Sequence, residues 1–261
     1  MKSLVDSARL HLSPETARFL RHALPNSVTI LALFFGLTGL VYAAKQDIVG
    51  AIACVLAAAI LDACDGRVAR ATGCASRFGA ELDSLSDVVC FGAVPAFILY
   101  NWGLSAFGGL GWLACLCLAG ASALRLARFN VMADDPAKPS WANHFFTGIP
   151  APGGAFLAML PIYAANSGAL TREEASYMAL AAVPVMAGLM VSTWPTFSAK
   201  AISRKALRVL FVPTIVALVM AAFGLVFSPW LTLTLCAIGY LWTLPVSKWR
   251  FELHQRRNLR P

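Results

Sequence analysis

The chain has 261 residues, of which 59% are hydrophobic and only 13% are charged. Soluble domains carry about 25% charged residues, so this composition argues against a soluble protein and for an integral membrane protein. The net charge of +8 does not require a nucleic-acid partner. Basic residues at one membrane face favour insertion and attract anionic lipids, and no groove-reading or RNA-binding motif accompanies them.

The N-terminal residues 1–25 are basic and irregularly apolar, and they lack the continuous apolar core of a cleaved signal peptide. Ser13 followed by Pro14 is a typical pair for the N-cap and first turn of a helix. The apolar residues after Pro14 are interspersed with Arg18 and Arg21. This pattern predicts a short amphipathic helix on the membrane surface, with a short solvated helix as the alternative.

Eight apolar segments follow, each close to the roughly 20 residues that a helix needs to cross a bilayer. They span residues 26–44, 48–63, 83–102, 107–128, 152–168, 175–193, 207–227 and 229–246. The sequence therefore predicts an all-α polytopic membrane protein with about eight transmembrane helices plus the N-terminal interfacial helix. We expect a cytoplasmic or interfacial segment at 1–25, a transmembrane domain at 26–246 and a basic cytoplasmic tail at 247–261.

Lysine and arginine residues gather in alternate connections between these segments. If the N-terminus is inside, the outward connections hold only Lys45 and Arg172, and the rest of the 21 basic residues lie on the inner side. Cytoplasmic loops carry such an excess of positive charge. We therefore expect both termini on the cytoplasmic side of the membrane.

Four aspartates, Asp62, Asp65, Asp83 and Asp87, stand where the second apolar segment ends and the third begins. In a helix, residues three or four apart lie on one face, so each pair shares a face of its helix. Carboxylates in a membrane segment are unfavourable, and they persist where they pair, bind ions or line a water-filled cavity. Four converging carboxylates would repel one another without cations, and their hard oxygens suit Mg²⁺ or Mn²⁺. The stretch predicts a metal-dependent active site at the cytoplasmic face.

Small residues accompany the aspartates. Gly79 lies on the same helical stripe as the second aspartate pair, where it leaves room for a ligand against the backbone. Gly66 and Ala69 follow the first pair and keep the facing helix clear. Arg70 provides a planar cation suited to bidentate contact with a phosphate.

Written out, the stretch reads Asp-x-x-Asp-Gly-x-x-Ala-Arg, then eight residues, then Gly-x-x-x-Asp-x-x-x-Asp. This pattern resembles the signature of the CDP-alcohol phosphatidyltransferase family. The resemblance implies transfer of a phosphatidyl group from CDP-diacylglycerol to an alcohol, with release of CMP, in an enzyme that forms homodimers. It also implies two divalent cations, Mg²⁺ or Mn²⁺, with Asp87 as general base. The implied metal ligands are Asp62, Asp65, Asp83 and Asp87, and the implied nucleotide and pyrophosphate contacts are Gly66, Ala69, Arg70 and Gly79.

Four later motifs narrow the choice of acceptor alcohol. They read FGAVPA at 91–96, RLARFN at 125–130, FTGIPAP at 146–152 and PTFSAK at 195–200. In this order they are similar to the membrane-embedded bacterial and archaeal members of the family that use L-serine. Alternatives are the same reaction with choline, glycerol 3-phosphate or an inositol phosphate, and, in a different class, an ion-coupled transporter.

Serine carries an α-carboxylate, which needs a cationic partner in a partly dry site. Arg125 and Arg128 lie three residues apart on one predicted helical face, and Asn130 follows just beyond. We expect these three residues to bind the serine carboxylate or the lipid phosphate. The alternative is topological, because arginines at the end of a segment often mark only the inner membrane boundary.

One position departs from the family pattern. The first apolar segment opens with Pro25, Asn26 and Thr29, after which the family usually has a second asparagine three residues later. This chain has Ala32 at that position. We therefore assign no ligand role to the first segment.

Overall fold

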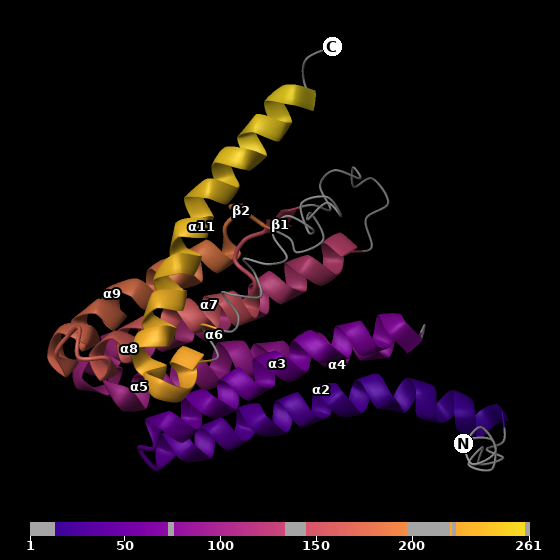
Figure 1. The fold of residues 1–261 in the computed structure, drawn as a ribbon, viewed down its shortest axis with the longest axis horizontal. Helices are drawn as coiled ribbons and strands as arrows, with labels where there is room; N and C mark the ends of the chain where they lie inside the picture. The colour runs from indigo at the N-terminus through magenta and orange to yellow at the C-terminus, as the bar shows by residue number, and fades with distance from the viewer. Residues whose placement is uncertain (1–13, 73–75, 134–144, 198–219, 221–222, 259–261) are drawn as a thin grey trace.

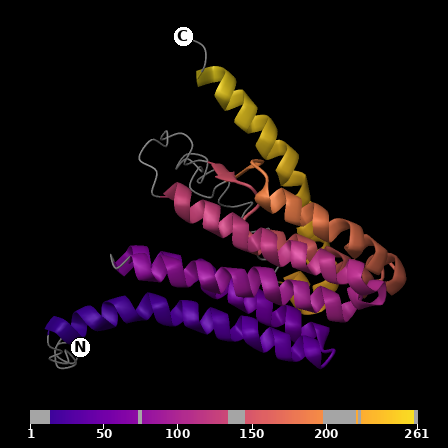
Figure 2. The same cartoon turned by 180° about the vertical axis from the view of Figure 1, so that it is seen from behind.

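The structure is a computed structural model that describes residues 14–72, 76–133, 145–197, 220 and 223–258. Its elements are α2 (Pro14–Ala44), α3 (Ile48–Thr72), α4 (Arg77–Val88), the π-helix η1 (Val89–Ala93), α5 (Val94–Trp102), the 3-10 helix η2 (Leu104–Phe107), α6 (Gly108–Ala133), β1 (Phe145–Thr147), α7 (Ala151–Ala158), α8 (Leu160–Asn166), α9 (Arg172–Val191), β2 (Pro195–Phe197) and α11 (Pro229–Asn258). The long helices form a bundle in which α2 packs along α3 and α6 packs along α9 (Figure 1). Figure 2 shows α2 at one edge of this bundle and the end of α11 extending beyond it.

Six helical stretches among the described residues are long and apolar enough to cross a membrane. They are Asn26–Ala44, Ile48–Gly66, Arg77–Trp102, Leu104–Met132, Arg172–Val191 and Pro229–Trp249. The predicted helical, polytopic class is confirmed, and the predicted count of eight is approximate. Of the other two predicted segments, 152–168 forms the short helices α7 and α8, which meet at Met159, and 207–227 lies mostly outside the described residues.

At both predicted boundaries of the transmembrane domain, residues 25/26 and 246/247, the structure has a continuous helix. Helix α2 begins at Pro14 and continues past Pro25 to Ala44, so residues 14–25 are helical and continuous with the first apolar segment. Their position on the membrane surface stays a prediction. A proline removes one helical hydrogen bond, which a membrane helix tolerates. Helix α11 likewise passes residue 246 and reaches Asn258, and its end stands clear of the bundle in Figure 1.

A small antiparallel sheet is the departure from the all-helical prediction. Strand β1 pairs with β2, with Phe146 opposite Thr196, so the two late motifs of the sequence are neighbours in space. Next to the sheet, the Thr196 hydroxyl donates to the Gly148 carbonyl at 2.8 Å, and the Gly148 amide donates to the Trp194 carbonyl at 2.8 Å. Gly148 has φ +79°, which only glycine adopts readily.

The helix that carries the second aspartate pair contains the π-helical turn η1 directly after it. This turn packs between neighbours on two sides. The Cys90 thiol donates to the Ala32 carbonyl of α2 at 3.5 Å, and a Cβ on Gly92 would lie 2.9 Å from Cβ of Ser122 on α6. Such π-turns are frequent at functional sites. Here the turn lets one helix approach both α2 and α6 closely.

Candidate active site

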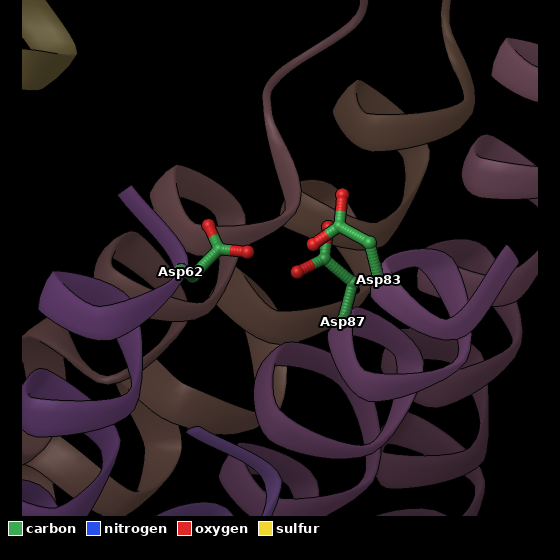
Figure 3. Close-up of side chains that lie close together, drawn as sticks. All are labelled: Asp62, Asp83 and Asp87. Atoms are coloured by element: carbon green, nitrogen blue, oxygen red, sulfur yellow. The ribbon is translucent and has the colours of Figure 1, made fainter. Parts of the chain in front are cut away.

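Three aspartate side chains converge between α3 and α4. Asp62 comes from α3, and Asp83 and Asp87 come from successive turns of α4. One oxygen of each carboxylate lies within 4.8 Å of the others. In Figure 3 the carboxylate of Asp62 points across the space between the helices toward the other two. The predicted convergence of aspartates from two helices is therefore present for these three residues.

The donor set fits a divalent cation. Oδ1 of Asp83 and Oδ1 of Asp87 are buried and have no hydrogen-bond partner among the described residues, although buried polar atoms are normally paired. Three carboxylates this close repel one another strongly in a medium of low dielectric constant. A cation between them removes this repulsion and satisfies the unpaired oxygens. All three side chains offer hard oxygen ligands, which exclude a thiolate-type zinc site.

Asp65 lies in a different environment from the other three aspartates. Its side chain is buried, with 5% exposed, and its Oδ2 accepts a hydrogen bond from the Thr29 hydroxyl at 2.7 Å. It does not belong to the group of three converging carboxylates. Its role as a metal ligand stays a prediction. The hydrogen bond between Thr29 and Asp65 was not predicted from the sequence. The pattern that could have indicated it is Pro25-Asn26-x-x-Thr29 at the start of the first apolar segment.

The small residues around the aspartates have different surroundings. The Gly79 amide donates to the N-cap Ser76 hydroxyl at 3.0 Å, and a Cβ on Gly79 would lie 3.0 Å from Oδ1 of Asn26. Gly79 therefore allows α2 to approach α4. Gly66 is half-buried in α3. Ala69 and Arg70 also belong to α3, but their side chains lie outside the described part, so the predicted phosphate contacts stay predictions.

Arg125 is the predicted acceptor-binding residue that the structure places beside the aspartates. From its position on α6, the Arg125 side chain interacts electrostatically with Asp87 and Asp62. Its side chain is buried, with 9% exposed, and its Nε has no hydrogen-bond partner among the described residues. A guanidinium that is both buried and incompletely paired is suited to binding an anionic group.

Arg128 and Asn130 lie on the same helix, but their side chains make contacts elsewhere. Arg128 donates through Nη1 to the Val191 carbonyl at 2.6 Å and through Nη2 to the Ser192 carbonyl at 3.0 Å, at the end of α9. Asn130 exchanges hydrogen bonds with Ser84 of α4. These two residues connect α6 to its neighbours, and their predicted contact with substrate stays a prediction.

Ala32, at the position where the family usually has asparagine, lies in the packed interior of the bundle. Ala32 is 2% exposed and packs in the hydrophobic core of the bundle. It follows Thr29 by one turn of α2, and its carbonyl accepts from Cys90. The position is therefore part of the contact between α2 and η1.

The fold and the site define a helical membrane protein with an acidic, metal-type centre formed by two of its spanning helices. The chain belongs to the CDP-alcohol phosphatidyltransferase family, whose sequence model matches residues 22–197. This match includes all four aspartates and confirms the resemblance drawn from their spacing.

Three relatives bear the name CDP-diacylglycerol–serine O-phosphatidyltransferase. The Mycobacterium leprae protein is 48% identical over 132 residues, which cover 51% of this chain and 44% of that protein. The Helicobacter pylori protein of strain 26695 is 36% identical over 177 residues, covering 66% of this chain and 72% of that one. The Methanocaldococcus jannaschii protein is 44% identical over 98 residues, covering 38% and 43%. The match thus spans less than half the length of the mycobacterial and methanogen relatives.

Proposed function

We propose that this protein transfers the phosphatidyl group of CDP-diacylglycerol to the hydroxyl of L-serine and releases CMP. The observation that carries the proposal is the convergence of Asp62, Asp83 and Asp87, with two unpaired oxygens, within a family-matched region. The names of the relatives support serine as the acceptor.

The proposed cofactor is a pair of divalent cations, Mg²⁺ or Mn²⁺. Asp62, Asp83 and Asp87 would hold them, with Asp65 as the fourth carboxylate that Thr29 orients. When bound, such cations neutralise the charge of the pyrophosphate and of the departing nucleotide. Gly66, Ala69, Arg70 and Gly79 are proposed to surround the nucleotide and its pyrophosphate.

Asp87 is proposed as the general base. In the reaction, the serine hydroxyl oxygen forms a bond to the lipid-linked phosphorus, the bond from that phosphorus to the CMP oxygen breaks, and the hydroxyl proton passes to the Asp87 carboxylate. A serine hydroxyl is far less acidic than a carboxyl group, so the proton leaves as the new bond develops. Proton transfer of this kind contributes about 10²–10⁴-fold to the rate.

Arg125 is proposed to bind the serine carboxylate, because it is buried beside Asp87 and has an unpaired nitrogen. Binding there would bring the acceptor close to its base. Arg128 and Asn130 are proposed to support this arrangement by fixing α6 against α9 and α4. We further propose that the site faces the cytoplasm of a bacterial inner membrane, and that the protein forms a homodimer.

The experiment is CMP release by the purified protein with CDP-diacylglycerol and either Mg²⁺ or Mn²⁺. L-serine, glycerol 3-phosphate, choline and an inositol phosphate are offered in separate reactions. We expect release with serine alone, abolished by a chelator. Release with a different acceptor would refute the choice of serine, and a folded protein that releases no CMP would leave an ion-coupled transporter as the better explanation.

Two variants make this experiment specific to the site. Asp83→Asn removes one converging carboxylate and should abolish release. Asp47→Asn is the matched control, because Asp47 is exposed at the beginning of α3 and accepts from the Gly50 amide at 2.9 Å. Asparagine caps a helix equally well, so this variant should keep the wild-type rate.

A further inference from the structure

The last described helix, α11, contributes one wall of the bundle beyond the region that the family model matches. It packs against α8, α7 and β2, whereas the family match ends at residue 197. The buried residues Leu233, Ala237 and Leu244 mark its inward face. Tyr240 lies on the same face, packs against the core and is half-buried.

The ring of Tyr240 is seated directly against the backbone of α7. A Cβ on Gly153 would lie 2.6 Å from the Tyr240 hydroxyl oxygen and 2.9 Å from its Cε1 atom. The glycine therefore provides the space that the ring occupies, since real Cβ atoms do not approach other atoms so closely. The hydroxyl makes no hydrogen bond to another described residue.

Tyr240 also lies within electrostatic range of Arg125, which in turn interacts with Asp87 and Asp62. A guanidinium from α6 thus interacts with the acidic centre on one side and with the phenol of Tyr240 from α11 on the other. The Arg125 Nε atom is buried and unpaired among the described residues. Buried donors are normally paired, and an anionic oxygen group is the ligand that both of these donors suit.

We propose that Tyr240 is a specificity-determining residue, whose hydroxyl donates a hydrogen bond to the anionic substrate group that Arg125 binds. The inference rests on the proposed function, within which this group is the serine carboxylate. Because α11 lies outside the family-matched region, it is a suitable place for a contact that distinguishes one acceptor from another.

The test is steady-state kinetics of Tyr240→Phe, which removes only the hydroxyl. A hydrogen bond to a charged group corresponds to roughly a tenfold or larger change in affinity. We expect the KM for serine to rise about tenfold, with kcat and the KM for CDP-diacylglycerol within about twofold of wild type. The preference for serine over serinol, which lacks the carboxylate, should narrow by the same factor. A rise confined to the KM for CDP-diacylglycerol would place the contact at the donor phosphate and would refute a role of Tyr240 in acceptor specificity.

Two further variants separate this role from a merely structural one. Tyr163→Phe is the control, because it removes a tyrosine hydroxyl on α8 that is buried and unpaired among the described residues; its kinetics should not change. Gly153→Ala displaces the Tyr240 ring and should raise the same KM, but it should add little in the Tyr240→Phe background.

The outcomes distinguish this inference from the proposed function. If the wild-type protein releases CMP with serine but Tyr240→Phe leaves both KM values unchanged, the role of Tyr240 is refuted and the proposed function stands. If the wild-type protein does not use serine, the proposed function itself fails.

Discussion

The four aspartates differ in what surrounds them, and these differences separate their roles. Asp83 and Asp87 each have a buried oxygen without a partner in the described part of the chain, whereas Asp65 is held by Thr29. An unpaired carboxylate oxygen is available to a cation or a proton, while a hydrogen-bonded carboxylate has a fixed orientation. Substitution of Asp87 should therefore affect the chemical step, whereas loss of the Thr29 hydroxyl should affect the orientation of the Asp65 carboxylate.

Asp87→Asn should lower the rate of CMP release by about 10²–10⁴-fold, because an amide cannot accept the hydroxyl proton. Binding of CDP-diacylglycerol should be partly retained, since Asp62 and Asp83 remain. Turnover and equilibrium donor binding are measured on the same preparation. Equal losses of both would assign Asp87 to holding the metal rather than to proton transfer.

Thr29→Val should raise the metal concentration needed for half-maximal activity by roughly tenfold or more, the typical effect of losing a partner behind a metal ligand. The substitution keeps the side-chain shape and removes the hydroxyl that Asp65 accepts from. Thr29→Ser retains a hydroxyl and should stay near wild type. An unchanged metal requirement in Thr29→Val would exclude Asp65 from the metal site.

Sequence spacing predicted the convergence of three of the four aspartates but not the contacts of the arginines. The i, i+3 and i, i+4 rules depend only on helix geometry, so residues four apart on α4 face the same space. Arg125 and Arg128 obey the same rule, but residues three apart differ by about 60° around a helix and 4.5 Å along it. Their long side chains consequently reach different neighbours, Arg125 toward Asp87 and Arg128 toward the end of α9.

At the scale of elements, the π-helical turn η1 and the two strands could not be read from the sequence. The turn η1 packs against α2 and α6, and such contacts between distant segments cannot be read from local residue preference. The strands are three residues long and their partners are far apart in the chain, so neither carries a detectable alternation. The continuity of α2 through Pro25 was missed because proline usually ends a helix.

The contact between α2 and η1 should be sensitive to small changes in volume. A Cβ on Gly36 would lie 2.5 Å from the Cys90 sulfur, so Gly36→Ala should destabilise the protein by about 1–3 kcal/mol through overpacking. Cys90→Ala in the same chain should restore most of the loss, because the sulfur is then absent. The thermal midpoint in detergent measures both effects, and additive losses in the double variant would contradict this contact.

The end of α9 should depend on Arg128. Its guanidinium donates to two carbonyls at the C-terminus of that helix, where a cation also complements the helix dipole. Arg128→Gln should lower stability by about 1–3 kcal/mol and change the KM for serine by less than about threefold. A large rise in that KM without a stability change would instead favour direct substrate contact.

At the scale of the whole molecule, the distribution of charge gives the expected orientation of the bundle. In a variant without the seven native cysteines, Ser105→Cys and Arg77→Cys place single thiols at exposed positions on opposite ends of the spans. With intact cells, a membrane-impermeant maleimide should label position 105 and spare position 77. The reverse pattern would place the aspartates on the outer side.

The net charge of the acidic centre determines which charged groups it attracts from the bilayer. Among the described side chains, four aspartates against Arg125 leave a formal charge of minus three where α3 and α4 meet. Two divalent cations would turn this into plus one. Without metal, the site would repel the phosphates of surrounding lipids, and with metal it would attract a pyrophosphate. The cations would thus open the site to anionic substrates, and metal binding should precede binding of the nucleotide lipid.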